Sequence, residues 1–172
     1  MKKLFLPILG VFLFIVITGL LAKEYRVKNQ KSLLVGGAPS ISNSMLVGET
    51  EVEVKYADSK SERANGLSNV ETLPESSGLL FIFEVPQTQP SFWMKDMNFP
   101  IDIIWISADK VVQVDYDVPP PEPNTPDEEL TIYSPKQPID YVLEVNGGFS
   151  AKNNIEVGSP VVLPNIAKTH YN

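Results

Sequence analysis

Apolar and polar residues follow different patterns along this chain, and the first pattern is an unbroken apolar run over residues 4–22. At the rise of an α-helix these 19 residues span about 28 Å, close to a bilayer core of about 30 Å. The run follows Lys2 and Lys3, as in an export signal, so it is either a membrane-spanning helix or a signal peptide. Because Leu20 occupies a position where cleavage sites need a small residue, we expect residues 1–22 to be retained as a single-pass anchor.

The apolar run is followed by a segment without periodicity. Residues 23–45 mix basic, small and turn-forming side chains, a composition typical of a flexible linker. Regular patterns begin near Leu46. We therefore predict a folded domain over residues 46–165 and a C-terminal tail over residues 166–172.

The predicted domain opens with a strand, a short helix and a second strand. Apolar and charged residues alternate with a period of two over residues 50–56, which indicates a half-exposed strand. Residues 59–65 combine N-cap candidates with helix formers, and Gly66 follows them, so we predict a short helix there. Residues 78–83 are almost entirely apolar and predict a buried strand.

The rest of the domain is predicted to be strands around one long loop. Seven of the fifteen prolines lie between Pro119 and Pro138, a density that excludes both a helix and a central strand. Ala108 and Asp109 alone separate two strands, which indicates a hairpin. The predicted strands are 91–97, 101–107, 110–118, 141–146 and 160–163, with one helical turn at 149–153. These elements predict an α+β fold, mainly antiparallel β, forming a small barrel or sandwich with one or two short helices.

Composition and charge exclude several classes of function. The chain has no cysteine, and its single histidine, His170, lies in the predicted tail. Disulfides, thiolate nucleophiles and histidine-based triads are therefore excluded from the domain, and we expect no metal and no cofactor. Beyond residue 31 the chain has 8 basic and 20 acidic residues, a net charge of −12. Such a domain repels phosphate backbones, so we do not expect nucleic acid as a partner.

Two carboxylates lie among aliphatic residues inside predicted strands, Asp102 and Glu144. A carboxylate buried without a partner is costly, so each must face water, meet a cation or accept hydrogen bonds from backbone amides. Arg63, whose planar fork suits a carboxylate, and Lys95 are the candidate cations. We hypothesise that the side chains of six ligand-binding candidates line one polar cleft, and that Tyr133, a seventh candidate, lies at its rim. The six are Arg63, Trp93, Lys95, Asp102, Glu144 and Asn146.

Each candidate has a structural interpretation beside the functional one. Asp102 and Glu144 could form an acid and base pair for hydrolysis, although such groups are more often structural partners. Trp93 could stack on a sugar or simply pack. The acidic residues at 122–129 could hold calcium, but prolines interrupt them and their spacing is not that of an EF-hand, so we expect a solvated loop.

Several short blocks occur in a specific order along the domain. They read RANGL at 63–67, GLLFIF at 78–83, FWMK at 92–95, PIDII at 100–104, YS at 133–134 and YVLEVN at 141–146, followed by Gly148. With these blocks the chain resembles the domain of unknown function 192 (DUF192) family from about residue 47 to residue 163. The resemblance implies a small, mainly β domain, often exported or membrane-tethered in prokaryotes, and no established activity.

Two function classes remain open. In the first, the chain is a non-enzymatic binding or accessory module at the membrane, contacting lipid through its N-terminal helix and binding a polar small molecule or a cell-envelope component. In the second, it is a carboxylate-dependent hydrolase of envelope glycan or peptide. We favour binding, because the domain has neither histidine nor cysteine. Lysine and arginine flank both ends of the apolar run, so we place the domain outside the cytoplasm from the form of the export signal alone.

Overall fold

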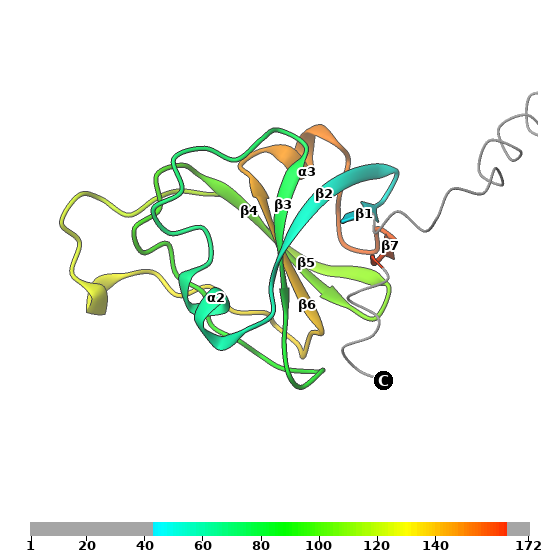
Figure 1. Cartoon of the computed structure of the whole chain (residues 1–172), viewed down its shortest axis with the longest axis horizontal. Coiled ribbons are helices and arrows are strands. Elements are labelled where there is room, and N and C mark those ends of the chain that lie inside the picture. The colour runs from blue at the N-terminus through cyan, green and yellow to red at the C-terminus, as the bar shows by residue number, and fades with distance from the viewer. Residues whose placement is uncertain (1–42, 165–172) are drawn as a thin grey trace, which may run out of the picture. The chain divides into compact units, whose positions relative to one another are not determined.

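Seven strands build the part of the chain that the computed structural model describes, residues 43–164. They form one sheet in the order β5-β4-β6-β3-β2-β1-β7, in which β2 and β3 are parallel and all other pairs are antiparallel. The strands are β1 (Ser44–Val47), β2 (Thr50–Ala57), β3 (Ser77–Ile82), β4 (Ile101–Ser107), β5 (Lys110–Val118), β6 (Tyr141–Asn146) and β7 (Val161–Val162), as Figure 1 shows.

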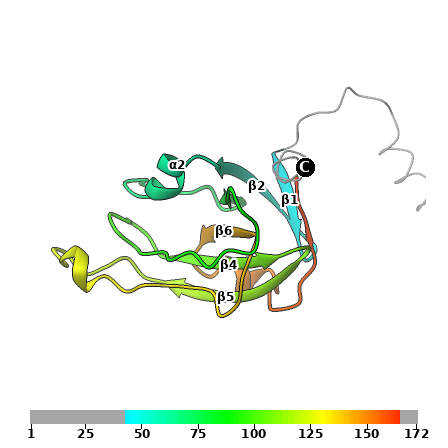
Figure 2. The same cartoon turned by 90° about the horizontal axis from the view of Figure 1, so that it is seen from below.

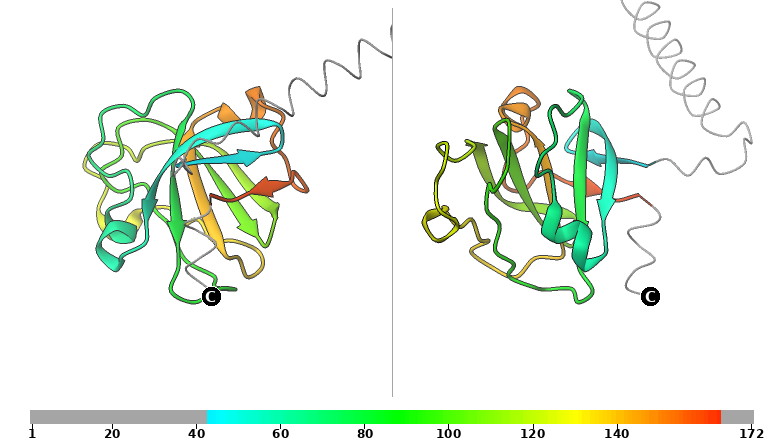
Figure 3. Two further views of the ribbon diagram at one scale, coloured as in Figure 1. Left: turned by 45° about the vertical axis from the view of Figure 1, so that its right-hand side comes forward. Right: turned by 60° about the vertical axis from the view of Figure 1, so that its left-hand side comes forward.

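The sheet curls until its two edge strands approach each other. Lys110 of β5 forms an isolated bridge with Pro160, and the amide of Val111 donates to the carbonyl of Ser159 at 3.0 Å. Figure 3 shows β7 in red next to β1 and turned toward the end of β5. The sheet is thus a nearly closed barrel, and two short helices, α2 (Lys60–Asn65) and α3 (Phe149–Lys152), accompany it. The predicted mainly antiparallel β fold is confirmed.

The membrane anchor, nearly all of the linker and the C-terminal tail predicted from the sequence lie outside the described residues. Between residues 43 and 164, no helix has the length and apolar character needed to span a membrane. The first strand, β1, begins at Ser44, just before the expected end of the linker.

Most predicted elements match the structure closely. The strands predicted at 101–107, 110–118 and 141–146 are β4, β5 and β6, and the predicted helix is α2 with Ser59 as its N-cap and Gly66 after it. The proline-rich segment 119–138, called the proline loop below, is irregular apart from a single 3-10 turn at Asp127–Glu129. It extends away from the barrel in Figure 2.

The strand predicted at 91–97 is wrong. This segment forms only one isolated bridge, between Phe92 and Tyr133 of the proline loop. Its side chains do alternate, with Met94 buried and Trp93 exposed, but Pro90 has no amide hydrogen and Asp96 adopts a φ of 57°, which ends any extended run. Alternation therefore reported the two faces of the segment correctly, although no neighbouring strand pairs with it.

The barrel wall separates two hydrophobic clusters. Along β3, Leu80 and Ile82 point into the barrel, whereas Leu79 and Phe81 point outward. The inner cluster fills the barrel. The outer cluster lies beneath α2, the segment 66–73, the segment 88–99 and the proline loop, which supply Leu67, Met94 and Tyr133 among other cover residues. The candidate site described below is a pocket between this outer face and the segments that cover it.

Asp102 lies on the inner side of the wall. It is fully buried, and its Oδ1 atom accepts hydrogen bonds from the amides of Asp117 at 2.8 Å and Gly148 at 3.0 Å. Its Oδ2 atom accepts from the amide of Ser150 at 2.7 Å, in the first turn of α3. Asp102 thus joins β4 to the end of β5 and to α3, and backbone amides rather than a cation stabilise its charge.

Replacing Asp102 by Asn should destabilise the domain by about 3 kcal/mol, because an amide NH₂ would face backbone donors inside the barrel. Chemical denaturation of the full-length chain, followed by tryptophan fluorescence, measures the free energy of unfolding. Asp109→Asn, in the exposed turn between β4 and β5, is the matched control and should change little. Equal stability of Asp102→Asn and the wild type would contradict this role.

Candidate functional site

Glu144 lies on the outer face of β6, opposite in orientation to Asp102. Within the sheet, Glu144 pairs with Ile103 of β4 and with Leu79 of β3, whereas Asp102 pairs with Val145. Because neighbouring residues on paired strands point to the same face, this register places Glu144 outside the barrel and Asp102 inside. The two carboxyl groups do not share a cleft.

A pocket of about 260 Å³ opens above Glu144. Its walls come from α2, from the segment Gly66–Ser68 that follows α2, from β3 and Phe83, and from residues 90–93. The glycine at position 66 matters here, because it has a φ of 50° and a Cβ atom there would lie 3.4 Å from the Phe81 ring and 3.8 Å from Oε2 of Glu144. Gly66 therefore allows the end of α2 to pass close over the floor of the pocket.

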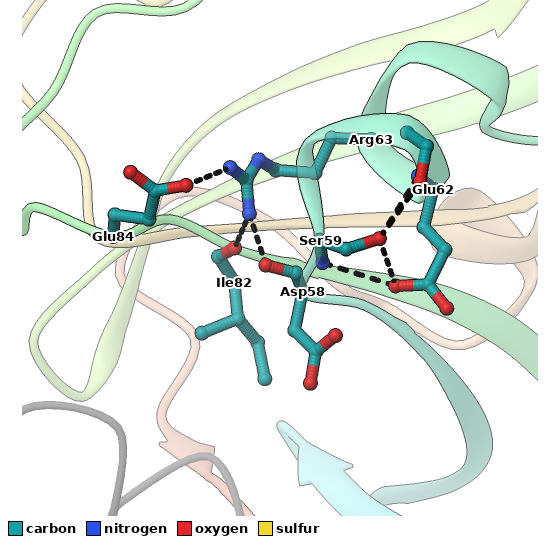
Figure 4. Close-up of polar contacts among 7 residues, drawn as sticks. Asp58, Ser59, Glu62, Arg63, Ile82 and Glu84 are labelled. Carbon is teal, nitrogen blue, oxygen red and sulfur yellow. Dashed lines mark hydrogen bonds and ion pairs between the residues drawn. The ribbon is translucent and has the colours of Figure 1, made fainter.

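Helix α2 is held in place by its own cap and by Arg63 (Figure 4). Ser59 and Glu62 form a reciprocal capping box at its N-terminus. The Arg63 guanidinium donates to the carbonyl of Asp58, to the carbonyl of Ile82 at 2.9 Å and to the carboxylate of Glu84 at 3.1 Å. This side chain fastens α2 to the end of β3, and Glu144 is not among its hydrogen-bond partners.

The Glu144 carboxyl is buried without a hydrogen-bond partner. Its side chain lines the pocket, the residue is 6% exposed, and Oε2 has no donor or acceptor within the described part of the chain. Burial raises the pKa of this carboxyl from 4.5 to about 8, because the surroundings solvate the charged form poorly. Burial therefore favours the neutral form of Glu144. No ion pair of Glu144 occurs among residues 43–164, so the predicted counter-ion is wrong for this residue.

Aromatic rings form the inner wall of the pocket. Phe92 packs edge-to-face between Phe81, at a centroid distance of 4.8 Å, and Trp105, at 5.4 Å. Trp105 is fully buried and donates its indole N–H to Asp115 at 2.7 Å. The row of rings fixes residues 90–93 on the sheet, so Trp93, which follows Phe92, is presented at the pocket with 52% of its surface exposed.

Several polar groups at the mouth of the pocket have no partner within residues 43–164. The side chains of Asn65 and Trp93 make no hydrogen bond there, and the ammonium group of Lys60 makes no ion pair. All three residues line the same pocket as Glu144, and all three side chains carry N–H donors. The pocket thus combines apolar walls with a few convergent donors, the usual character of small-molecule sites.

Of the predicted cleft residues, Arg63, Trp93 and Glu144 line the pocket. Lys95 instead forms an ion pair with Asp127 of the proline loop, and Tyr133 exchanges backbone hydrogen bonds with Phe92, both at 2.9 Å.

The remaining two predicted residues have other neighbours. Asn146 donates to the carbonyls of Leu73 and Pro74 at 3.0 and 3.2 Å, and Asp102 binds amides on the other side of the wall. The single cleft predicted from the sequence is thus divided among several places.

Asn65, Gly66, Phe81 and Phe83 line the pocket, although we did not single them out as binding residues. A signal was present for the two phenylalanines, because a period of two along 79–83 places them on one face. Asn65 and Gly66 were interpreted only as the end of a helix. Sequence patterns do not show that a helix end lies above a particular strand.

The comparisons with known proteins agree with this fold. A family model described as DUF192, an uncharacterized ACR, matches residues 43–163. The chain belongs to the DUF192 family. No curated protein matches it.

Two solved structures resemble this DUF192 domain. A protein of unknown function from Novosphingobium aromaticivorans is 26% identical, with a TM-score of 0.61, and the alignment covers 69% of this chain and 83% of that protein. A Sinorhizobium meliloti protein, provisionally named a transcription regulator, is 21% identical with a TM-score of 0.60, over 69% of this chain and 89% of that one. Both support the fold of the DUF192 domain.

The pH dependence of stability should reveal the buried acid. As pH rises from about 4.5 toward about 8, residue 144 ionises in the unfolded chain but stays protonated in the folded chain, so folding loses about 1.4 kcal/mol per pH unit. Gln cannot ionise. The free energy of unfolding of Glu144→Gln, measured in urea, should therefore gain on the wild type by roughly 3 kcal/mol between pH 5 and pH 8.

Glu51→Gln, on the exposed side of β2, is the control for this experiment and should follow the wild type at every pH. A constant difference between Glu144→Gln and the wild type across this range would show that Glu144 is ionised in the folded protein.

Proposed function

We propose that this DUF192 chain is a non-enzymatic binding module, held at the membrane by residues 1–22, with its domain outside the cytoplasm. Its ligand is a small polar molecule that enters the pocket under α2. One observation carries the binding function: Glu144 lines the pocket, and Oε2 of its carboxyl group is buried without a hydrogen-bond partner among the described residues. A buried polar group left unsatisfied costs about 1–3 kcal/mol, and a ligand that bonds to it recovers this energy.

The dimensions of the pocket support one small ligand. Its 260 Å³ lies just below the range of about 300–1,000 Å³ that is typical of pockets for drug-sized molecules. The aromatic wall supplies apolar contact area, and Glu144, Asn65 and Lys60 supply polar groups. Because the row formed by Phe81, Phe92 and Trp105 holds the wall, the pocket is formed before a ligand arrives.

The hydrolase alternative needs two carboxyl groups about 5–9 Å apart on either side of the bond to be cleaved. Asp102 and Glu144 project from opposite faces of the sheet, and both oxygens of Asp102 already accept amide hydrogen bonds. A lone neutral acid on an aromatic floor is suited to donate a hydrogen bond. The geometry therefore favours binding over hydrolysis by this pair.

The location rests on the sequence. Residues 4–22 are uncharged and long enough to span a bilayer, and Lys2 and Lys3 precede them. A domain displayed on a membrane by a linker can bind a component of the cell envelope without needing its own catalytic groups. A binding role and an envelope location thus support each other.

A reporter enzyme that becomes active only when its disulfides form, fused after Asn172, should be active in cells, because disulfides persist outside the cytoplasm. Enzyme activity in whole cells, normalised to the amount of fusion protein, is the measurement. The same fusion without residues 1–22 is the control and should be inactive. An inactive full-length fusion would place the domain in the cytoplasm and remove the envelope partner.

The two tryptophans report on the pocket in opposite ways, since Trp93 lines it and Trp105 is buried. A mixture of neutral monosaccharides and small amides, added to the ¹⁵N-labelled full-length chain in detergent, should shift the indole N–H signal of Trp93 in NMR spectra and leave that of Trp105 unchanged. Trp93→Ala should weaken binding about tenfold, through lost ring contacts.

Tyr116→Ala removes an aromatic ring of nearly equal exposure on β5, 51% against 52%, and should leave the affinity unchanged. If no compound in the mixture shifts the Trp93 signal, or if Tyr116→Ala weakens binding as much as Trp93→Ala does, the pocket is not the binding site.

A further inference from the structure

We propose that the ligand of this pocket is an N-acetylated sugar, stacked on Trp93, whose acetamido carbonyl accepts a hydrogen bond from the Glu144 carboxyl. This inference rests on the proposed binding function and names the ligand class for the same site. It follows from three properties of the pocket. The Glu144 carboxyl at its floor has no hydrogen-bond acceptor beside it, and two cationic side chains line one wall. The third property is the exposed indole of Trp93, which also lines the pocket.

A ligand with a hydrogen-bond acceptor fits the floor of the pocket best. Oε2 of Glu144 has no partner among residues 43–164 and lies under Gly66 and the Phe81 ring, neither of which offers a side-chain acceptor. A carboxylic acid in such a place donates its O–H to whatever acceptor reaches it. An amide carbonyl is a strong neutral acceptor. Because Oε2 itself is enclosed, such an acceptor would meet the carboxyl group of Glu144 on the side where this residue lines the pocket.

The charges around the pocket favour a neutral ligand. Lys60 and Arg63 line the same wall, so a cationic ligand would meet two positive charges and would also force Glu144 to ionise in apolar surroundings. An anionic ligand would approach a chain whose net charge beyond residue 31 is −12. A neutral molecule with several acceptor oxygens avoids both penalties.

The mouth of the pocket favours a saturated ring with hydroxyl groups. Trp93 exposes half of its surface there, and a flat indole face packs well against the C–H face of a sugar ring. The side-chain N–H groups of Asn65 and Trp93, unpaired within residues 43–164, can donate to ring oxygens. The volume of 260 Å³ suits a single ring with its substituents.

Binding through the protonated acid gives a definite pH dependence. The ionisable groups that face Glu144 in the pocket are Lys60 and Arg63 of α2, while β3, the segment 66–68 and residues 90–93 contribute none to the lining. Burial raises the pKa of Glu144 to about 8, so the donor is present at pH 6–7 and is lost above pH 8. Affinity for an acetamido sugar should then be constant up to about pH 7 and about tenfold weaker at pH 9.

Three probes with the same ring separate the possibilities: N-acetylglucosamine, glucose and glucosamine. Titration calorimetry on the full-length chain in detergent, at pH 6.5, should show N-acetylglucosamine binding at least tenfold more tightly than glucose, which lacks the carbonyl. Glucosamine, which carries an ammonium group instead, should bind no better than glucose. Tighter binding of glucosamine than of N-acetylglucosamine would overturn the proposal in favour of an ionised Glu144.

Two variants test the role of the acid. Glu144→Gln keeps a neutral N–H donor in the same place, so it should bind N-acetylglucosamine within about threefold of the wild type at pH 6.5 and show no loss of affinity at pH 9. Glu144→Ala removes the donor and should weaken binding at least tenfold at pH 6.5. Loss of binding by a folded Glu144→Gln, or a pH dependence equal to that of the wild type, would contradict a hydrogen bond donated by Glu144.

The failure of this inference can be told from the failure of the proposed function. If none of the three sugars binds but small amides still shift the Trp93 signal, the pocket binds a ligand and the sugar assignment is wrong. If neither the sugars nor the mixture of monosaccharides and amides shifts that signal, both are wrong.

Discussion

The register between β4 and β6 determines the faces of the sheet on which Asp102 and Glu144 lie. Pairing Asp102 with Val145 and Ile103 with Glu144 sends one acid into the barrel and the other out of it. The two acids then meet opposite environments. Asp102 finds three backbone amides and acts as a structural anchor for α3, while Glu144 finds aromatic rings and no partner. A shift of one residue between these strands would place both acids on the same face of the sheet, because side chains alternate between the faces.

The second constraint is the use that the structure makes of Arg63. Its guanidinium is engaged by the carbonyls of Asp58 and Ile82 and by Glu84, so it holds α2 over the outer face instead of neutralising Glu144. The pocket exists because α2 is held there, and Glu144 at its floor forms no ion pair with Arg63, whose guanidinium is occupied elsewhere. The contacts of Arg63 thus have two results. They fix the wall of the pocket, and they leave Glu144 without this cation as a partner.

Local features of this fold could be predicted from the sequence, whereas the register between paired strands could not. The sequence pattern located β4, β5 and β6. Alternation shows which residues share a face within one strand. It does not show which residues of the neighbouring strand lie on that same face, because that depends on register. This is why Asp102 was grouped with Glu144.

Long-range pairing also explains the other differences. The partner of Lys95 lies in the proline loop, and the segment 91–97 pairs with that loop at Phe92 rather than with a strand. Nothing in the local sequence encodes either contact. The buried acid itself was visible in the sequence as a charge among aliphatic residues, but its lack of a partner became visible only with its neighbours in place.

The pairing of β1 with β7 has a consequence for how the domain responds to mechanical force. These strands are antiparallel, with Leu46 opposite Val162 and Val47 opposite Val161, so the chain enters β1 and leaves β7 at the same edge of the barrel. Force applied to the two ends of the domain would act directly on the pairing of β1 with β7 and would break its hydrogen bonds one after another. The wall formed by β3, β4 and β6, which carries the pocket floor, would not bear the load first.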